Sequence, residues 1–115
     1  MRWNIRSDLP VYSQLVEHIK LAIVSGEFPL GSRLPSVREL AADAGVNPNT
    51  MQRALSELER RGLVCARRTA GCFVTEDAGC IEKERRALAE EQARDFLDAM
   101  EALGYNRVQS VVLLV

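Results

Sequence analysis

The chain has 115 residues, of which 47% are hydrophobic and 27% are charged. This is the composition of an ordinary soluble domain, and it excludes a large multi-domain enzyme, a disordered chain and a collagen-like chain. The longest apolar run, residues 111–115, is far shorter than the roughly 18 residues that cross a bilayer, and the N-terminus carries no secretory leader pattern. We therefore expect a cytoplasmic protein whose three cysteines are reduced thiols, because they are odd in number and lack metal-ligand spacing.

Charge is distributed unevenly along the chain, although the formal net charge is only −1. Between residues 33 and 68 there are seven arginines and four acidic residues, whereas between residues 76 and 101 there are nine acidic and four basic residues. Charge alone leaves two interpretations open: a basic middle segment that faces an anionic partner, or charges scattered over a solvated surface.

Helical spacing and capping residues predict two helices in the first part of the chain. The first covers residues 10–25, with Asp8 or a neighbour at its start. The second begins with a capping box, in which Ser36 accepts from the backbone and Glu39 reaches back. Gly45 then supplies the permissive backbone position that a tight turn requires.

A third helix is predicted to follow this turn directly. Asn47 is suited to cap it, and Pro48 is suited to its first position, where no backbone donor is needed. Four apolar residues recur at helical spacing and should be buried: Met51, Ala54, Leu55 and Leu58. The same spacing turns polar residues outward: Asn49, Gln52, Arg53, Ser56 and Arg60.

The rest of the chain is predicted to form a hairpin and a long helix. Residues 63–67 and 72–75 are β-rich and are joined by a cationic link. Residues 78–103 form a helical run that would extend about 37 Å and overhang a small domain, which makes a second copy of the chain the economical packing partner. For residues 106–115 a helix and a strand both remain open, since the β-branched valines favour a strand.

Two helices joined by a short glycine turn and followed by a basic hairpin describe a winged helix-turn-helix. Over residues 10–75 the chain resembles the GntR family of bacterial transcription regulators. The resemblance is carried by Pro10-Val11-Tyr12-Ser13-Gln14-Leu15, by Gly31-Ser32-Arg33-Leu34-Pro35-Ser36-Val37-Arg38-Glu39-Leu40-Ala41, by Gly45-Val46-Asn47-Pro48-Asn49-Thr50, and by Arg61-Gly62-Leu63-Val64 to Gly71-Cys72-Phe73-Val74. The start of the third helix and the short remainder after the hairpin are similar to the YtrA-type subfamily, whose members add only a two-helix dimerisation region.

The resemblance implies a mainly α fold with a small β-hairpin: a winged helix-turn-helix DNA-binding domain at 1–76 and a helical dimerisation region at 77–115, with the final segment helical. It implies a homodimer, more often a repressor than an activator, that binds double-stranded DNA at an inverted-repeat operator and is neither an enzyme nor dependent on a cofactor or metal. The recognition helix, 47–61, would enter the major groove, and the wing, 67–71, would lie on the backbone or in the minor groove.

The implied DNA contacts follow from residue type, since Asn and Gln can read adenine and Arg can read guanine or bind phosphate. They are Arg33, Ser36, Arg38, Asn47, Asn49, Thr50, Gln52, Arg53, Arg67, Arg68, Thr69 and Gly71. The implied dimer contacts are Ile81, Leu88, Phe96, Met100 and Leu103.

Several alternatives stay open from the residues alone. Asn47 is equally suited to do no more than cap its helix, and Arg33 is equally suited to be a solvated charge. For Arg38, pairing with an acid is the less favoured alternative to a DNA contact. A protein-docking module and a thiol redox enzyme using Cys65 and Cys72 are the rival functions, although buried apolar cysteines are favoured over a redox pair. A small-molecule effector is a further open partner.

Overall fold

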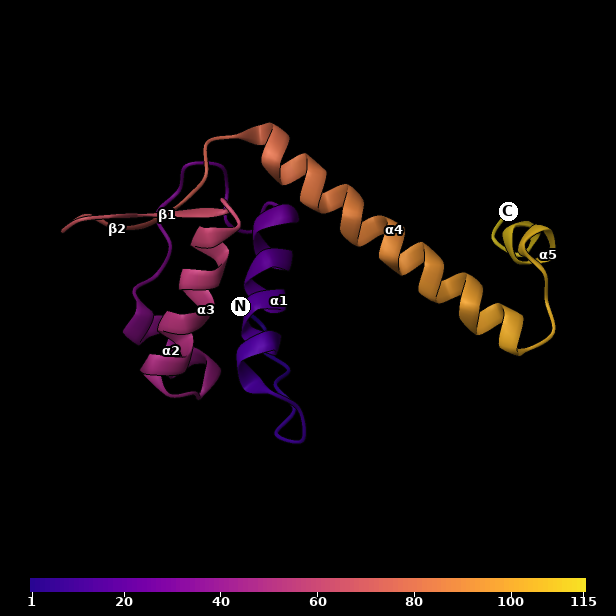
Figure 1. Cartoon of the computed structure of the whole chain (residues 1–115), viewed down its shortest axis with the longest axis horizontal. Coiled ribbons are helices and arrows are strands. Elements are labelled where there is room, and N and C mark those ends of the chain that lie inside the picture. The colour runs from indigo at the N-terminus through magenta and orange to yellow at the C-terminus, as the bar shows by residue number, and fades with distance from the viewer. The chain divides into compact units, whose positions relative to one another are not determined.

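The computed structural model describes the whole chain, residues 1–115. In chain order it contains α1 (Val11–Val24), α2 (Val37–Ala44), α3 (Pro48–Arg60), β1 (Val64–Arg67), β2 (Gly71–Val74), α4 (Ala78–Ala102) and α5 (Arg107–Val112), as drawn in Figure 1. The chain divides into two compact units, Met1–Glu82 and Lys83–Val115. The predicted fold class, mainly α with one small hairpin, is confirmed.

The core of the first unit is built around α3, which packs against both α1 and α2 and lies between them in Figure 1. Its four predicted core residues, Met51, Ala54, Leu55 and Leu58, are at most 4% exposed. They share one face of the helix because they recur three and four residues apart. The opposite face of α3 is therefore left for solvent or for a partner.

Local hydrogen bonds define the start of α2 and the turn that joins α2 to α3. Ser36 Oγ accepts from the backbone N–H of Glu39, and the Glu39 carboxylate accepts from the backbone N–H of Ser36, both at 3.1 Å. Gly45 ends α2 in the left-handed region, with φ 72°. Asn47 Oδ1 then accepts from the backbone N–H of Asn49 at 2.7 Å and begins α3. The predicted capping box, glycine turn and Asn cap are all confirmed.

Asp8 does not begin α1, although the sequence offered it as one candidate for the start of this helix. Pro10 occupies the N-cap position, and no side chain caps the helix. The Asp8 carboxylate is instead paired with Arg6, 2.7 Å from Nη2. Gln14 connects the preceding loop to the helix, because its Oε1 accepts from the backbone N–H of Arg6 at 2.7 Å.

The segment that precedes α2 pairs with the outer edge of β2. Residues 32–34 run antiparallel to β2: the Leu34 backbone N–H donates to the Cys72 carbonyl, and the Val74 N–H donates to the Ser32 carbonyl, each at 2.8 Å. β1 and β2 are therefore stabilised on one side by a segment that the predicted hairpin did not include.

The second unit begins inside α4 and not at the 76/77 boundary expected from the sequence. The first turn of α4 belongs to the first unit because Ile81 is only 5% exposed there. The final segment is a short helix, α5, as the family resemblance favours. None of the helices combines the length and the apolar character that a bilayer crossing needs.

Candidate nucleic-acid interface

The first turns of α3 present polar side chains on the face that does not pack. Asn49, Gln52 and Arg53 are exposed, and Thr50 is half-buried. The Asn47 oxygen accepts the helix-cap hydrogen bond, and its amide donors stay available for another partner. Asn, Gln and Arg are the side chains that bind base edges bidentately, so this face carries groups suited to reading DNA.

Two exposed arginines on the neighbouring elements, α2 and the wing, lack a carboxylate partner. Arg38 is exposed on α2 and forms no ion pair, so the alternative that it pairs with an acid does not hold. Arg68 is also exposed and unpaired, at the tip of the hairpin beside Thr69, whose φ is 66°. A guanidinium without a carboxylate keeps its N–H donors for phosphate oxygens.

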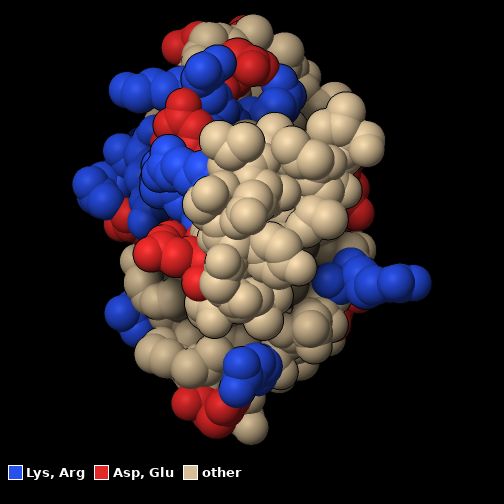
Figure 2. Space-filling model, turned by 90° about the vertical axis from the view of Figure 1, so that its right-hand side faces the viewer, with Lys and Arg blue, Asp and Glu red and all other residues tan.

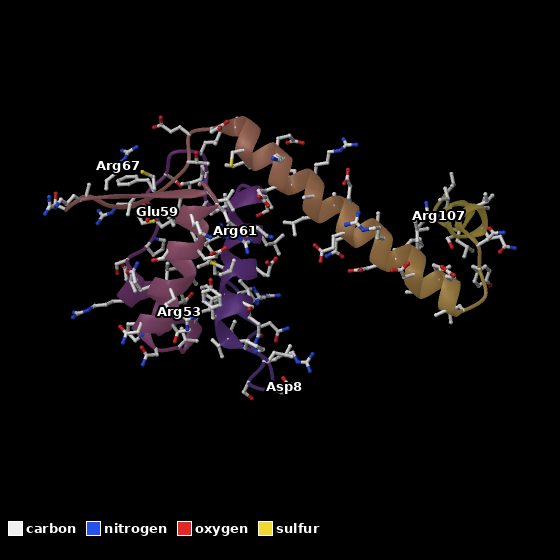
Figure 3. The ribbon with its side chains drawn as sticks, viewed as in Figure 1. Asp8, Arg53, Glu59, Arg61, Arg67 and Arg107 are labelled. Carbon is white, nitrogen blue, oxygen red and sulfur yellow. The ribbon has the colours of Figure 1, made fainter.

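The other arginine of the wing is held back by its neighbours. Arg67, labelled on the hairpin in Figure 3, places its guanidinium carbon 4.5 Å from the centroid of the Phe73 ring. Its Nη2 also lies 3.9 Å from Glu76 Oε1. The two neighbouring wing cations are therefore in different positions: Arg67 packs against the hairpin, and Arg68 extends from it.

The base of the wing brings Arg33 and Gly71 into close approach. Gly71 has φ 111°, a conformation that side chains rarely adopt, and a Cβ placed on it would lie 2.9 Å from Arg33 Nε. The absence of a side chain at Gly71 thus admits the Arg33 side chain, whereas the family resemblance suggested only room for DNA.

A groove of about 420 Å³ lies between the start of α2, the exposed side of α3 and the wing. It brings together half of the residues implied for DNA contact: Arg33, Ser36, Gln52, Arg67, Thr69 and Gly71. The others lie outside this groove in the same unit: Arg38, Asn47, Asn49, Thr50, Arg53 and Arg68.

Two acidic residues of α3 are occupied within the unit. Glu59 Oε2 accepts from the backbone N–H of Ala66 at 2.9 Å and so ties β1 to α3, and its label in Figure 3 lies where α3 approaches the hairpin. Glu57 accepts from Arg60 Nε and from Arg61 Nε, each at 2.8 Å. These two guanidinium groups lower the pKa of Glu57 to about 2. Much of the acidic charge of the basic middle segment is therefore engaged inside the fold.

Three residues near the interface were not found by the sequence analysis: Tyr12, Glu59 and Phe73. Tyr12 lies in α1 and contacts Arg53 of α3, with 4.7 Å between the ring centroid and the guanidinium carbon. Spacing within one helix carries no information about a contact between two helices. Phe73 had a weak signal, since alternation along β2 places it two residues from Gly71 on the same face of the strand.

Cys65 and Cys72 are less buried than the sequence analysis predicted. Cys65 is exposed and Cys72 is half-buried. Cys65 is opposite Phe73 and Ala66 is opposite Cys72, so the two cysteines lie on different faces of the hairpin. Burial raises the pKa of the Cys72 thiol and keeps it protonated. The prediction of burial was wrong for Cys65 because a two-stranded wing has one face without a covering layer.

Exposed apolar side chains are concentrated in the second unit. Among the implied dimer contacts there, Leu88, Phe96 and Met100 are half-buried, and Leu103 is 72% exposed. Further exposed apolar residues follow, which the sequence analysis did not include: Val108, Val111, Val112, Leu113, Leu114 and Val115. On the face drawn in Figure 2, side chains without charge form a broad continuous area.

A comparison with known protein families matches the first unit of the chain. The family model described as "Bacterial regulatory proteins, gntR family" matches residues 11–74, which span α1 to β2. The chain belongs to the GntR family. It is therefore a DNA-binding transcription regulator and not an enzyme, and the part matched is the winged helix-turn-helix.

Relatives in Bacillus subtilis match beyond the winged domain. The HTH-type transcriptional regulator YhcF is 39% identical over 104 residues, which cover 90% of this chain and 86% of YhcF. The HTH-type transcriptional repressor YtrA is 35% identical over 96 residues, which cover 82% of this chain and 74% of YtrA. The expected similarity to the YtrA-type regulators is confirmed.

Solved structures of similar proteins share the fold. A GntR family transcriptional regulator from Listeria monocytogenes superposes with a TM-score of 0.88 at 35% identity, covering 96% of each chain. The DNA-binding domain of AraR, solved in complex with operator ORE1, superposes with a TM-score of 0.57 at 28% identity and covers 65% of this chain and 94% of that domain.

Proposed function

We propose that the chain is a homodimeric repressor that binds an inverted-repeat operator, with α3 in the major groove and the wing, residues 67–71, on the backbone or in the minor groove. The observation that carries this proposal is the exposed polar start of α3, together with the unpaired guanidinium groups of Arg38 on α2 and Arg68 on the wing. A polar helix face that reads bases, accompanied by cations that bind phosphate, is the arrangement that winged-helix recognition requires.

Within this proposal the implied contacts take different roles. Asn49, Thr50, Gln52 and Arg53 read base edges, and Asn47 adds its free amide donors. Arg33, Arg38, Arg68 and Thr69 bind phosphates. Ser36 and Gly71 act through position, since the first caps α2 and the second admits Arg33. Arg67 orders the wing, because it already packs on Phe73.

The dimer is assigned to the region 77–115, and its support is the exposed apolar surface of the second unit. Leu88, Phe96, Met100 and Leu103 remain the proposed contacts on α4, and the valines of α5 extend them. Ile81 offers little surface to a second copy, because it is buried within its own chain. The role of repressor is supported by the name of the relative YtrA, and operator binding by the AraR complex.

Selection of bound duplexes from a random DNA pool, with purified protein at two salt concentrations, tests the proposal. We expect an enriched inverted repeat whose half-sites lie about 34 Å apart. Binding to it should weaken steeply as salt rises, since phosphate contacts release counterions. No enrichment at either concentration would contradict operator binding and favour a protein-docking module.

Single arginine variants then locate the interface. Arg38→Ala is expected to weaken binding to the selected operator and to reduce the slope of log affinity against log salt concentration by about one, because Arg38 is assigned to a phosphate. Arg94→Ala on α4 removes the same charge outside the proposed DNA face and serves as the matched control. Equal effects of the two variants would show that net charge, and not position, determines binding.

A further inference from the structure

The contact between Tyr12 and Arg53 joins the first turn of α1 to the exposed face of α3. The Arg53 guanidinium carbon lies 4.7 Å from the centroid of the Tyr12 ring, a distance typical of a cation–π contact. Tyr12 is half-buried and Arg53 is exposed, so the ring belongs to the packed body of the unit and the guanidinium to its surface. Figure 3 labels Arg53 on the N-terminal half of α3.

Arg53 is left to the ring because the nearest acid on its own helix is already occupied. Glu57 is four residues further on, the usual spacing for an ion pair on a helix. Its carboxylate is bound by Arg60, through both Nε and Nη2, and by Arg61. The charge of Arg53 is therefore not neutralised within the chain.

A ring holds a guanidinium in a way that a carboxylate does not. A cation–π contact attracts the charge of the guanidinium to the ring face, whereas a carboxylate would accept hydrogen bonds from its N–H donors. The donors on Arg53 thus remain available for the two acceptors of a guanine edge or for phosphate oxygens. A side chain that is ordered before binding also loses less entropy when it binds.

The same contact places Tyr12 beside the side chains that are proposed to read bases. A shallow hollow of about 310 Å³ is lined by Tyr12 of α1 and by five residues of α3: Gln52, Arg53, Ser56, Glu57 and Arg60. This hollow lies on the α1 side of α3, whereas the larger groove lies toward the wing. The exposed face of the recognition helix is thus bordered on two sides, by the wing and by α1.

We propose that Tyr12 is a positioning residue for DNA recognition: its ring holds the Arg53 guanidinium over the surface of α3, with the donors free for a base edge. This inference rests on the proposed operator binding and adds a residue of α1 to the specificity of α3. Tyr12 acts through Arg53 and is assigned no contact with DNA of its own.

Two substitutions at Tyr12 separate the ring from its hydroxyl group. Tyr12→Phe keeps the ring and should leave operator affinity within about twofold of the original protein. Tyr12→Leu removes the ring and should weaken binding about two- to fivefold, the range that corresponds to an exposed cation–π contact. Thermal melting of each variant, followed by circular dichroism, establishes that both remain folded.

The decisive readout is the base preference, measured with operators that carry one substituted base pair at a time. Tyr12→Leu should reduce discrimination at the same base pair as Arg53→Ala. In the Arg53→Ala background, Tyr12→Leu should have no further effect on affinity. In the Arg38→Ala background, which serves as the matched control, its effect should be the same as in the original protein.

The outcomes distinguish this inference from the proposed function. If the original protein binds an operator but Tyr12→Leu weakens binding by the same factor with and without Arg53, positioning by Tyr12 is wrong and operator binding stands. An unchanged base preference together with a lower melting temperature would assign Tyr12 a role in packing only, and also overturns it. If the original protein enriches no duplex, both proposals fail together.

Discussion

Glu57 binds two arginines near the end of α3 and is itself only 16% exposed. Hydrogen bonds from Arg60 and Arg61 stabilise its charged form and lower its pKa from 4.5 to about 2. Folding stability is coupled to this ionisation, because the unfolded chain releases the proton at a higher pH than the folded chain does. The carboxylate thus contributes stability above its unfolded pKa and loses it as the pH falls toward 2.

Replacing Glu57 by Gln tests this coupling. Above about pH 5 we expect Glu57→Gln to be less stable than the original protein by a constant amount. Between pH 4.5 and 2 the difference should shrink, since protonation of Glu57 removes the same ion pairs. Urea unfolding at a series of pH values measures it, and a difference independent of pH across this range would contradict the assignment.

At the scale of elements, the hydrogen bonds between Ser36 and Glu39 define the start of α2. They also lower the pKa of Glu39, because the backbone N–H and the hydroxyl group of Ser36 both favour the carboxylate. Ser36 lines the groove beside the wing as well, so its effect on DNA binding has two sources, the helix cap and the groove surface.

Two variants of Ser36 separate these sources. Ser36→Ala removes the cap and should lower the free energy of unfolding by about 1 kcal/mol. Ser36→Asp keeps a capping oxygen and should retain most of the stability, but its negative charge in the groove should weaken binding to the selected operator. Urea unfolding and operator titration measure the two effects. A loss of stability in Ser36→Asp as large as in Ser36→Ala would mean that the cap is not what Ser36 contributes.

The elements themselves could be predicted because their signals are local. Met51, Ala54, Leu55 and Leu58 mark the buried face of α3 by spacing alone, and Asn47 with Pro48 marks its start. The part of the candidate site on α3 was predictable for the same reason. The residues that are not on the buried face of a helix lie on its exposed face.

What could not be predicted depends on contacts between elements that are distant in the sequence. Tyr12 meets Arg53 across two helices, and Arg33 meets Gly71 across the base of the wing. The different positions of Arg67 and Arg68 depend on the ring of Phe73 and on Glu76. No spacing rule within one element encodes such pairs. The sequence therefore predicted twelve DNA contacts from residue type, and it could not distinguish the surroundings that the structure gives to each side chain.

At the scale of the whole molecule, the two units differ in how completely they bury their apolar residues. The first unit has a closed core around α3, with Leu15, Ile19 and Met51 fully buried. In the second unit only Ser110 of α5 is buried, and its hydroxyl group donates a hydrogen bond to the Asn106 carbonyl. The apolar residues of α5 are exposed. Apolar surface of this extent favours association with a partner chain.

Charge introduced into this surface should separate the proposed dimer. Leu103→Asp and Val111→Asp are expected to halve the mass measured by sedimentation equilibrium. They should also weaken binding to the inverted repeat on the order of a hundredfold, because the two half-sites are then bound independently. Leu30→Asp places the same charge at an exposed apolar residue of the first unit and is the control, expected to leave the mass unchanged. An unchanged mass in the Leu103 and Val111 variants would contradict the assignment of the dimer to this surface.

The close approach of Arg33 to Gly71 has an evolutionary consequence. A side chain at position 71 would adopt a strained backbone conformation, φ 111°, and its Cβ would lie 2.9 Å from the Arg33 side chain unless that side chain moved. Among homologous sequences we therefore expect the two positions to vary together: glycine at 71 where 33 is long, and a short residue at 33 wherever glycine has been lost. Substitution of Gly71 alone should be rare, because the new side chain would be strained and would meet Arg33, whereas a shorter residue at 33 creates no such clash.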